Sequence, residues 1–289
     1  MSLILDAHSS AERAHATAAA AAASANVRIV DEHQRERLQD IEGLLVAIWG
    51  MSPHGAPIPF DLLRSISHAG CNVSAAYTPE GVLCGAAVAI VAPEGLTYSL
   101  IAGVLPGIAD KGVGFALKQH QRAWSLARGI ETMTWTFDPL VSRNARFNLS
   151  KLGAATSTYE RNFYGLMEDE INANDESDRL VVIWPLSSER SLRCSEGLVD
   201  EVNLPQGALL NVIEYGPDAQ PALVRSDGNL WCRAPHDILA LRESDPQEAA
   251  MWRSQLREIL ESAFASGYIA SGVTRTGWYK LTPSSTTSQ

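Results

Sequence analysis

The chain has 289 residues, of which 46% are hydrophobic and 19% charged, and its formal net charge is −10 with a pI of about 5.2. This composition is that of an ordinary globular protein rather than a disordered one. The excess of acidic residues argues against nucleic acid as the main partner. An anionic ligand can still bind, but it needs a local site.

The cysteines are too widely spaced for a metal centre or a disulfide framework. They are Cys71, Cys84, Cys194 and Cys232. The histidines likewise show no spacing that suggests metal ligands. We therefore expect reduced thiols, no metal and a cytoplasmic protein.

Two terminal segments are expected to lie outside the fold. Residues 1–25 are rich in alanine, and Asp6 and Glu12 precede the small-residue run, which is unlike a secretory signal. This segment is predicted to be a disordered or helical arm. The polar tail after Leu281 is predicted to be disordered. No run of ~18 apolar residues occurs, so we expect neither a membrane span nor a membrane partner.

Strand and helix patterns alternate from residue 27 onward. Strands are predicted at residues 27–30, 72–78, 82–92, 97–104, 131–137, 156–165, 178–186, 207–216, 267–273 and 276–282. Helices are predicted at residues 31–50, 59–70, 114–128, 142–152 and 245–266, with Ser142 as an N-cap. The pattern indicates a mixed α/β protein with a core at residues 26–187 and a C-terminal extension at residues 188–289.

A glycine loop lies between the strand at residues 97–104 and the next helix. Gly112 and Gly114 stand at the start of that helix, where free backbone N–H groups favour phosphate or pyrophosphate. A dinucleotide-binding fingerprint needs a small residue where Leu117 stands, and the P-loop sequence is absent. A turn without a ligand remains the alternative from spacing alone.

The loop Ala109-Asp110-Lys111-Gly112-Val113-Gly114 resembles the R/Q-x-x-G-x-G/A loop of the GCN5-related N-acetyltransferase (GNAT) superfamily. The helix after the fifth strand ends in SKLGA, similar to the K-L-G-F of that superfamily. The resemblance covers about residues 27–186. The run WTFDPLVSRNARFNLSKLGA is similar to that of a bacterial subgroup of predicted acyltransferases with a C-terminal extension. The resemblance implies a mixed, mostly antiparallel twisted sheet flanked by helices, with a coenzyme A thioester as co-substrate.

The resemblance, together with the polar residues near the matching motifs, indicates the candidate site residues. The cofactor-binding set is Val104, Ala109, Asp110, Lys111, Gly112, Val113, Gly114 and Asn144. The catalytic candidates are Asp138, Asn148 and Tyr164, with Glu160 and Tyr159 as weaker alternatives. Asn144 and Asn148 are four residues apart and are expected on one helix face. If this face points inward, the two side chains hold a water or the pantetheine amides. If it points outward, they are ordinary surface residues.

Other polar residues have two interpretations each. Asp138 is either a general base or a turn residue before Pro139. Lys118 and Arg122, also four apart, either meet the nucleotide 3′-phosphate or form a solvated basic face. Near Ala102 to Val104, a splayed fourth strand is expected to donate an N–H to the thioester carbonyl.

The sequence departs from the superfamily pattern at two places. Ala109 stands where the superfamily has Arg or Gln, and Asp110 adds a negative charge beside the expected pyrophosphate site. Leu149 stands where a tyrosine often acts as general acid. We expect an N-acyltransferase that acylates the amine of a small molecule such as an amino acid, with acetyl, succinyl or a longer acyl group. The alternative is a non-catalytic ligand-sensing or assembly module. The extension covers the acceptor cleft or forms a homodimer interface.

Overall fold

The computed structural model describes residues 2–50, 55–108, 111–165 and 175–284 of the chain, with side chains described from residue 10 onward. These residues form two compact units, each considered by itself below. Unit 1 contains the described parts of residues 1–135 and 185–196, and unit 2 contains those of 136–184 and 197–289. The division therefore differs from the boundary expected at residues 187–188.

Unit 1 is a sheet with helices on both faces. Its helices are α1 (Ser2–Ser24), α2 (Arg35–Trp49), α3 (Phe60–His68), α4 (Val113–Leu126) and α6 (Glu189–Ser195), with a short turn of helix at Pro93–Gly95. Its strands are β1 (Arg28–Asp31), β2 (Asn72–Tyr77), β3 (Leu83–Ala92), β4 (Leu96–Val104) and the first part of β5 (Thr132–Phe137). Their order is β1-β2-β3-β4-β5; β4 and β5 run parallel, and the other neighbours run antiparallel.

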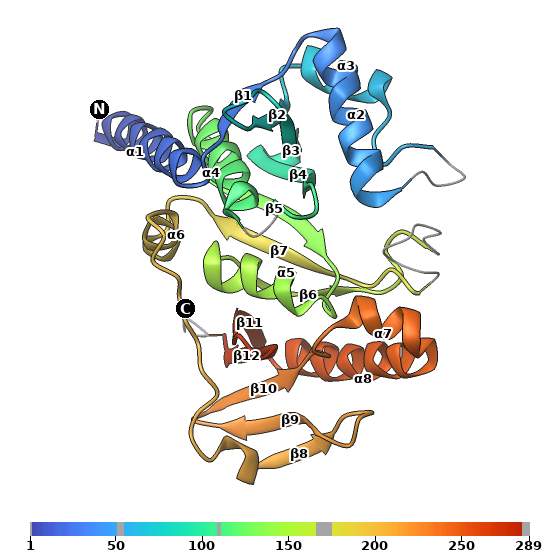
Figure 1. Ribbon diagram of the computed structural model, residues 1–289. Helices are drawn as coiled ribbons and strands as arrows, with labels where there is room; N and C mark the ends of the chain where they lie inside the picture. The colour runs from blue at the N-terminus through green and yellow to red at the C-terminus, as the bar shows by residue number, and fades with distance from the viewer. Residues whose placement is uncertain (1, 51–54, 109–110, 166–174, 285–289) are drawn as a thin grey trace. The chain divides into compact units, whose positions relative to one another are not determined.

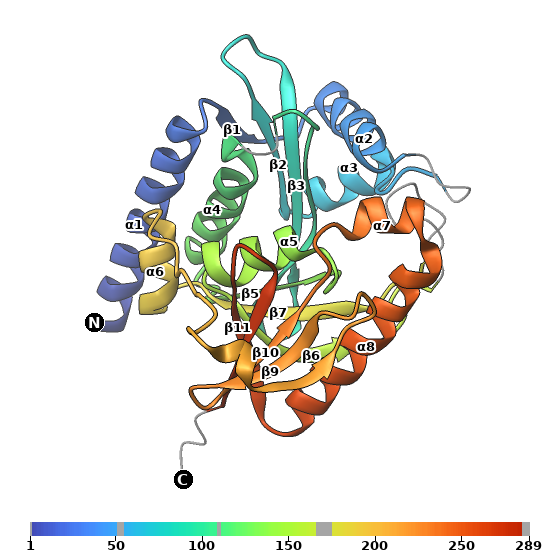
Figure 2. The same ribbon diagram turned by 60° about the horizontal axis from the view of Figure 1, so that its bottom comes forward.

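The buried strands β2 and β3 explain why helices cover both faces of this sheet. Alternate side chains point to opposite faces. Ala75 and Tyr77 pack in a cluster with α2 and α3, whereas Ala76 and Ala87 pack in a cluster with α4. Figures 1 and 2 show α2 and α3 on one face of β2 and β3, and α4 on the other.

Helix α1 is part of the fold, in contrast to the expected external arm. Ala14, Ala18, Ala21 and Ala25 recur at helical spacing and are buried. Ala21 and Ala25 share a cluster with residues of α4, and both views place α1 beside that helix. Small side chains permit this close approach. The helical part of the prediction is correct, and the position outside the fold is wrong.

Unit 2 contains the rest of β5 and a sheet that runs into the C-terminal extension. Its strands are β6 (Ala155–Glu160), β7 (Arg179–Pro185), β8 (Val212–Tyr215), β9 (Pro221–Ser226), β10 (Asn229–Arg233), β11 (Tyr268–Val273) and β12 (Trp278–Pro283). Its helices are α5 (Ser142–Arg146), a π-helix (Phe147–Lys151), α7 (Ile238–Ser244) and α8 (Pro246–Ala265), with a 3₁₀ turn at Ala208–Leu210.

The extension continues the sheet of unit 2 rather than forming a sheet of its own. The order is β7-β6-β11-β12-β10-β9-β8, and β11 pairs antiparallel with β6. Trp252, Leu256 and Ile259 of α8 are buried, as the amphipathic pattern predicts. Strands β9 and β10 and helices α6 and α7 have no counterpart among the predicted elements. Val141, not Ser142, is the N-cap residue of α5.

The expected fold class is confirmed: a mixed, mostly antiparallel sheet flanked by helices. Among the described residues, no helix is both long enough and apolar enough to cross a membrane.

Candidate functional site

The glycine loop forms the expected helix N-terminus. Gly112 precedes α4 with φ of +89°, a left-handed conformation that residues with a Cβ rarely adopt. Ala116 donates its N–H to the Gly112 carbonyl at 3.0 Å, the first bond of the helix. The amides of Val113, Gly114 and Phe115 therefore have no partner within the helix. Together with the helix dipole they can hold an anion.

The residues beside this helix start are also defined in part. Val104 ends β4, and a Cβ added at Gly114 would lie 3.8 Å from Val104 Cγ2. Lys111 is exposed immediately before Gly112. Ala109 and Asp110 lie outside the described residues. The described part of the loop fits a pyrophosphate through its backbone amides.

Strand β4 separates from β5 as the resemblance implies. Their parallel pairing runs from Leu96 with Thr132 to Tyr98 with Thr134, while β4 continues to pair with β3 as far as Val104. The register with β3 shifts between Ser99 and Ile101, which marks a β-bulge.

Two backbone donors face the side on which β4 leaves β5. The Leu105 N–H donates to the Cys84 carbonyl at 3.0 Å. Because amides alternate in direction along an antiparallel strand, those of Ala102 and Val104 point away from β3. These are the donors that the sequence analysis expects for a thioester carbonyl.

Trp49, a residue that the sequence analysis missed, lies on the same stretch of β4. A Cβ added at Gly103 would stand 2.4 Å from Cη2 of Trp49, so the indole packs directly on the strand backbone. The signal that could have found this contact is a glycine inside a strand, which often marks close approach of another group.

Lys118 and Arg122 are buried, so they do not form a solvated basic face. The Lys118 side chain donates to Ser99 Oγ at 2.7 Å and lies 4.0 Å from the centre of the Trp135 ring. Burial lowers the pKa of Lys118 to about 7. Arg122 Nε donates to the Leu186 carbonyl at 2.8 Å. Burial lowers the pKa of Arg122 to about 10, which leaves it charged at neutral pH.

Asp138 is held by three donors in unit 2. Its Oδ1 accepts from the Leu140 N–H at 2.9 Å, and its Oδ2 accepts from Arg242 at 2.6 Å and from Arg253 at 3.2 Å. Burial alone would raise the pKa of Asp138, but the Arg253 and Arg242 guanidiniums outweigh it and the pKa is lowered. The geometry favours the turn-residue interpretation over a general base.

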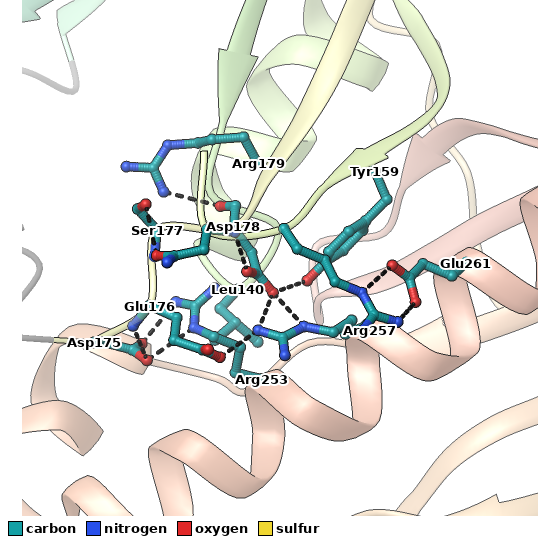
Figure 3. Close-up of polar contacts among 12 residues, drawn as sticks. Leu140, Tyr159, Asp175, Glu176, Ser177, Asp178, Arg179, Arg253, Arg257 and Glu261 are labelled. Carbon is teal, nitrogen blue, oxygen red and sulfur yellow. Dashed lines mark hydrogen bonds and ion pairs between the residues drawn. The ribbon is translucent and has the colours of Figure 1, made fainter. Parts of the chain in front are cut away.

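Asp138 belongs to a larger buried ion-pair network, which Figure 3 shows in part. Asp175 pairs with Arg242 and Arg253, and Asp178 pairs with Arg257. The Tyr159 hydroxyl donates to Asp178 at 2.5 Å. Burial, followed by this bond and the Asp178 charge, raises the pKa of Tyr159, which disfavours it as a base. The network joins α7 and α8 to the segments around β6 and β7.

The remaining candidates differ in exposure. Asn144 is exposed on α5, and Asn148 is buried in the π-helix that follows it. Tyr164 is 51% exposed, with its hydroxyl 3.4 Å from Thr136 Oγ1. Leu149 is fully buried.

The described arrangement can be compared with known folds. A fourth strand that leaves a parallel fifth strand, with a glycine loop and a helix between them, is the arrangement that the resemblance implies. No protein-family model matches the chain, and no curated protein matches it.

Solved acetyltransferase structures are similar to this chain over a little more than half of its length. The ribosomal-protein-S18-alanine N-acetyltransferase of Escherichia coli is 16% identical with a TM-score of 0.45, covering 56% of this chain and 95% of that one. A phosphinothricin acetyltransferase from Sinorhizobium meliloti, solved with acetyl-CoA, is 16% identical with a TM-score of 0.46 and coverages of 55% and 88%. YncA of Salmonella typhimurium, solved with its cofactor acetyl-CoA, is 15% identical with a TM-score of 0.45 and coverages of 57% and 96%.

Proposed function

We propose that the chain is an N-acyltransferase that moves an acyl group from a coenzyme A thioester to the amine of a small molecule such as an amino acid. The observation that carries this proposal is the helix N-terminus at Gly112 beside the splayed end of β4. The amides of Val113, Gly114 and Phe115 would hold the pyrophosphate, helped by the positive end of the helix dipole. Acetyl-CoA is the ligand that the Sinorhizobium and Salmonella structures hold.

The described residues support an acyl transfer in which the chain positions the reactants and stabilises charge. The amine attacks the thioester carbonyl carbon, the amide bond forms, and the carbon–sulfur bond breaks to release the thiol. The N–H groups of Ala102 and Val104 would stabilise the developing oxyanion. Holding the two substrates together supplies a large part of the rate. The amine loses one proton as the amide forms, and the departing sulfur takes up one proton, so the transfer balances. Leu149 cannot donate to the sulfur, so that proton comes from another group or from water.

The proposal is tested by measuring thiol release from acyl-coenzyme A in the presence of candidate amines. Replacing Gly112 by Val and Gly114 by Leu should abolish release, because the first change strains the left-handed position and the second covers the amides. Gly70→Val is the matched control, since Gly70 also has a positive φ of +77° with open space around it. If the folded double variant released thiol as fast as the wild type, the loop would not be the thioester site.

A non-catalytic ligand-sensing module is the second candidate, and a specific observation favours it. Three donors hold the Asp138 carboxylate, which disfavours it as a general base, and Leu149 has no ionisable group. Thermal unfolding with thioesters, against adenine nucleotides, separates the two candidates. A ligand at a hundredfold excess over its dissociation constant adds about 2.7 kcal/mol. Stabilisation of this size by a thioester, with no thiol release in the presence of any amine tested, would support the sensing module.

A further inference from the structure

A buried cluster of polar side chains lies between α4 and β4 in unit 1. Lys118 Nζ donates to Ser99 Oγ at 2.7 Å, and Ser99 Oγ donates to Gln121 Oε1 at 2.9 Å. All three residues are at least 95% buried. The amide nitrogen Nε2 of Gln121 is buried and has no hydrogen-bond partner among the described residues.

Counting donors and acceptors shows what this cluster lacks. A protonated lysine has three donors and no acceptor, and the amide nitrogen of glutamine has two donors. The acceptors in the cluster are Ser99 Oγ and Gln121 Oε1, and each already receives one bond. Each oxygen can accept one bond more, but four donors of Lys118 and Gln121 remain for these two lone pairs. The cluster therefore has more donors than acceptors. Buried donors without acceptors are costly, so the missing group is an acceptor.

The charge of Lys118 is also uncompensated. Within the part of the chain that the structure describes, no carboxylate forms an ion pair with Lys118, and the groups that contact its Nζ are neutral: the Ser99 hydroxyl from β4 and the Trp135 ring from β5. Charged groups that are buried are normally paired. An anionic acceptor would satisfy the spare donors and the charge together.

The position of the cluster identifies which part of a ligand could reach it. Tyr98 of β4 and Thr134 of β5 form the last pair between these strands. Ser99 and Trp135 are the next residues of the two strands. The cluster thus lies where the two strands begin to separate, at the opposite end of the splayed segment from Val104 and the glycine loop. If the proposed function holds, the pyrophosphate of the thioester lies at the glycine loop. The acyl end of the thioester then extends toward the place where β4 and β5 separate.

We propose that Lys118 and Gln121 form a receptor for a terminal carboxylate on the acyl group, so that the chain uses the coenzyme A monothioester of a dicarboxylic acid rather than acetyl-CoA. This inference rests on the proposed function and names its acyl donor class. The carboxylate accepts from Lys118 Nζ and Gln121 Nε2. The transfer itself is unchanged, because the carboxylate lies at the far end of the acyl chain from the carbon that is attacked.

The preference for a carboxylated acyl group should depend on pH. A lysine with a purely structural role would not make the choice of substrate depend on pH. Burial lowers the pKa of Lys118 to about 7, and a bound carboxylate would raise it again. Preference for a carboxylated acyl group is therefore strongest while Lys118 is protonated. The preference should decline as the pH rises above neutrality.

The experiment compares succinyl-CoA with butyryl-CoA, which has the same number of acyl carbons and no terminal carboxylate. The wild type should favour succinyl-CoA by roughly 100-fold in kcat/KM, since removing one partner of a buried charge contact has an effect of this order. Lys118→Met should abolish the preference, so that succinyl-CoA is used no better than butyryl-CoA. Lys280→Met is the matched control, because it replaces the lysine of β12 in unit 2. This variant should keep the preference for succinyl-CoA.

Two results would overturn the inference while leaving the proposed function intact. One is a wild type that uses butyryl-CoA or acetyl-CoA as well as succinyl-CoA. The other is a succinyl preference that survives in Lys118→Met. Thermal unfolding with the same thioesters tests the receptor even without turnover, because succinyl-CoA should stabilise the wild type more than butyryl-CoA does. If no thioester either turns over or shifts unfolding, both proposals fail.

Discussion

The two units hold buried cationic side chains with different partners. In unit 2 three buried or half-buried guanidiniums, those of Arg242, Arg253 and Arg257, pair with Asp138, Asp175 and Asp178. In unit 1 the described bonds of Lys118 and of Arg122 Nε go to neutral oxygens, namely the Ser99 hydroxyl and the Leu186 carbonyl.

This contrast separates a structural role from a candidate binding role. Burial would lower the pKa of Arg253, but Asp138 and Asp175 raise it above its usual range. Burial lowers the pKa of Lys118 with no such compensation. When carboxylates of the protein already pair with a buried cation, the fold itself accounts for the burial of that charge. A buried cation without them is a functional-site candidate, because folding alone gains nothing from leaving it unpaired.

The largest expected effect comes from removing one carboxylate of the paired network. Asp138→Ala leaves Arg242 and Arg253 buried with one counter-charge fewer and should lower the free energy of unfolding by about 3–5 kcal/mol. Urea denaturation measures the change. A loss well below 1 kcal/mol would show that the network contributes little to stability, and the contrast between the units would lose its meaning.

Removing the unpaired cation should change how stability depends on pH. A folded-state pKa of about 7 lies below the unfolded value of a lysine, so the unfolded chain binds the extra proton between these values. The Lys118 contribution therefore makes stability rise with pH from about 7 to about 10, by up to about 1.4 kcal/mol per unit. Lys118→Met should lack this slope in denaturation curves at pH 7, 8 and 9. Parallel curves would mean that Lys118 titrates normally.

The paired network should show its pH dependence in a lower, acidic range. Because the pKa of Asp138 is lowered in the folded state, its stabilisation is present above the unfolded pKa of about 3.9 and is lost as the pH falls through the folded value. Asp138→Asn should be less stable than the wild type near neutrality, and the two should converge in acid. Unfolding followed between pH 5 and pH 2 tests this. A constant difference across that range would contradict it.

The smallest effect is expected at an exposed pair of the same charge type. Arg161 pairs with Glu261 in unit 2, but the Arg161 side chain is 61% exposed, so solvent screens the attraction. Glu261→Gln should leave the denaturation midpoint unchanged within error. A shift as large as that of Asp138→Ala would show that burial is not what distinguishes the two pairs.

Features determined by neighbours in sequence were predictable from the sequence. Gly112 adopts a left-handed conformation before a helix because a residue without a Cβ tolerates it, and the loop was recognised from this spacing. Trp252, Leu256 and Ile259 repeat at helical spacing and form the buried face of α8. Such patterns report one element and its own periodicity.

Burial and pairing were decided only by the tertiary structure. Lys118 and Arg122 have the spacing of a solvated face, yet the sheet and α1 together cover α4. Asp138 meets Arg242, a residue 104 positions away, so no local pattern could indicate their ion pair. The reason is physical: the environment of a charged side chain depends on what packs opposite it, and in this chain those partners come from distant segments.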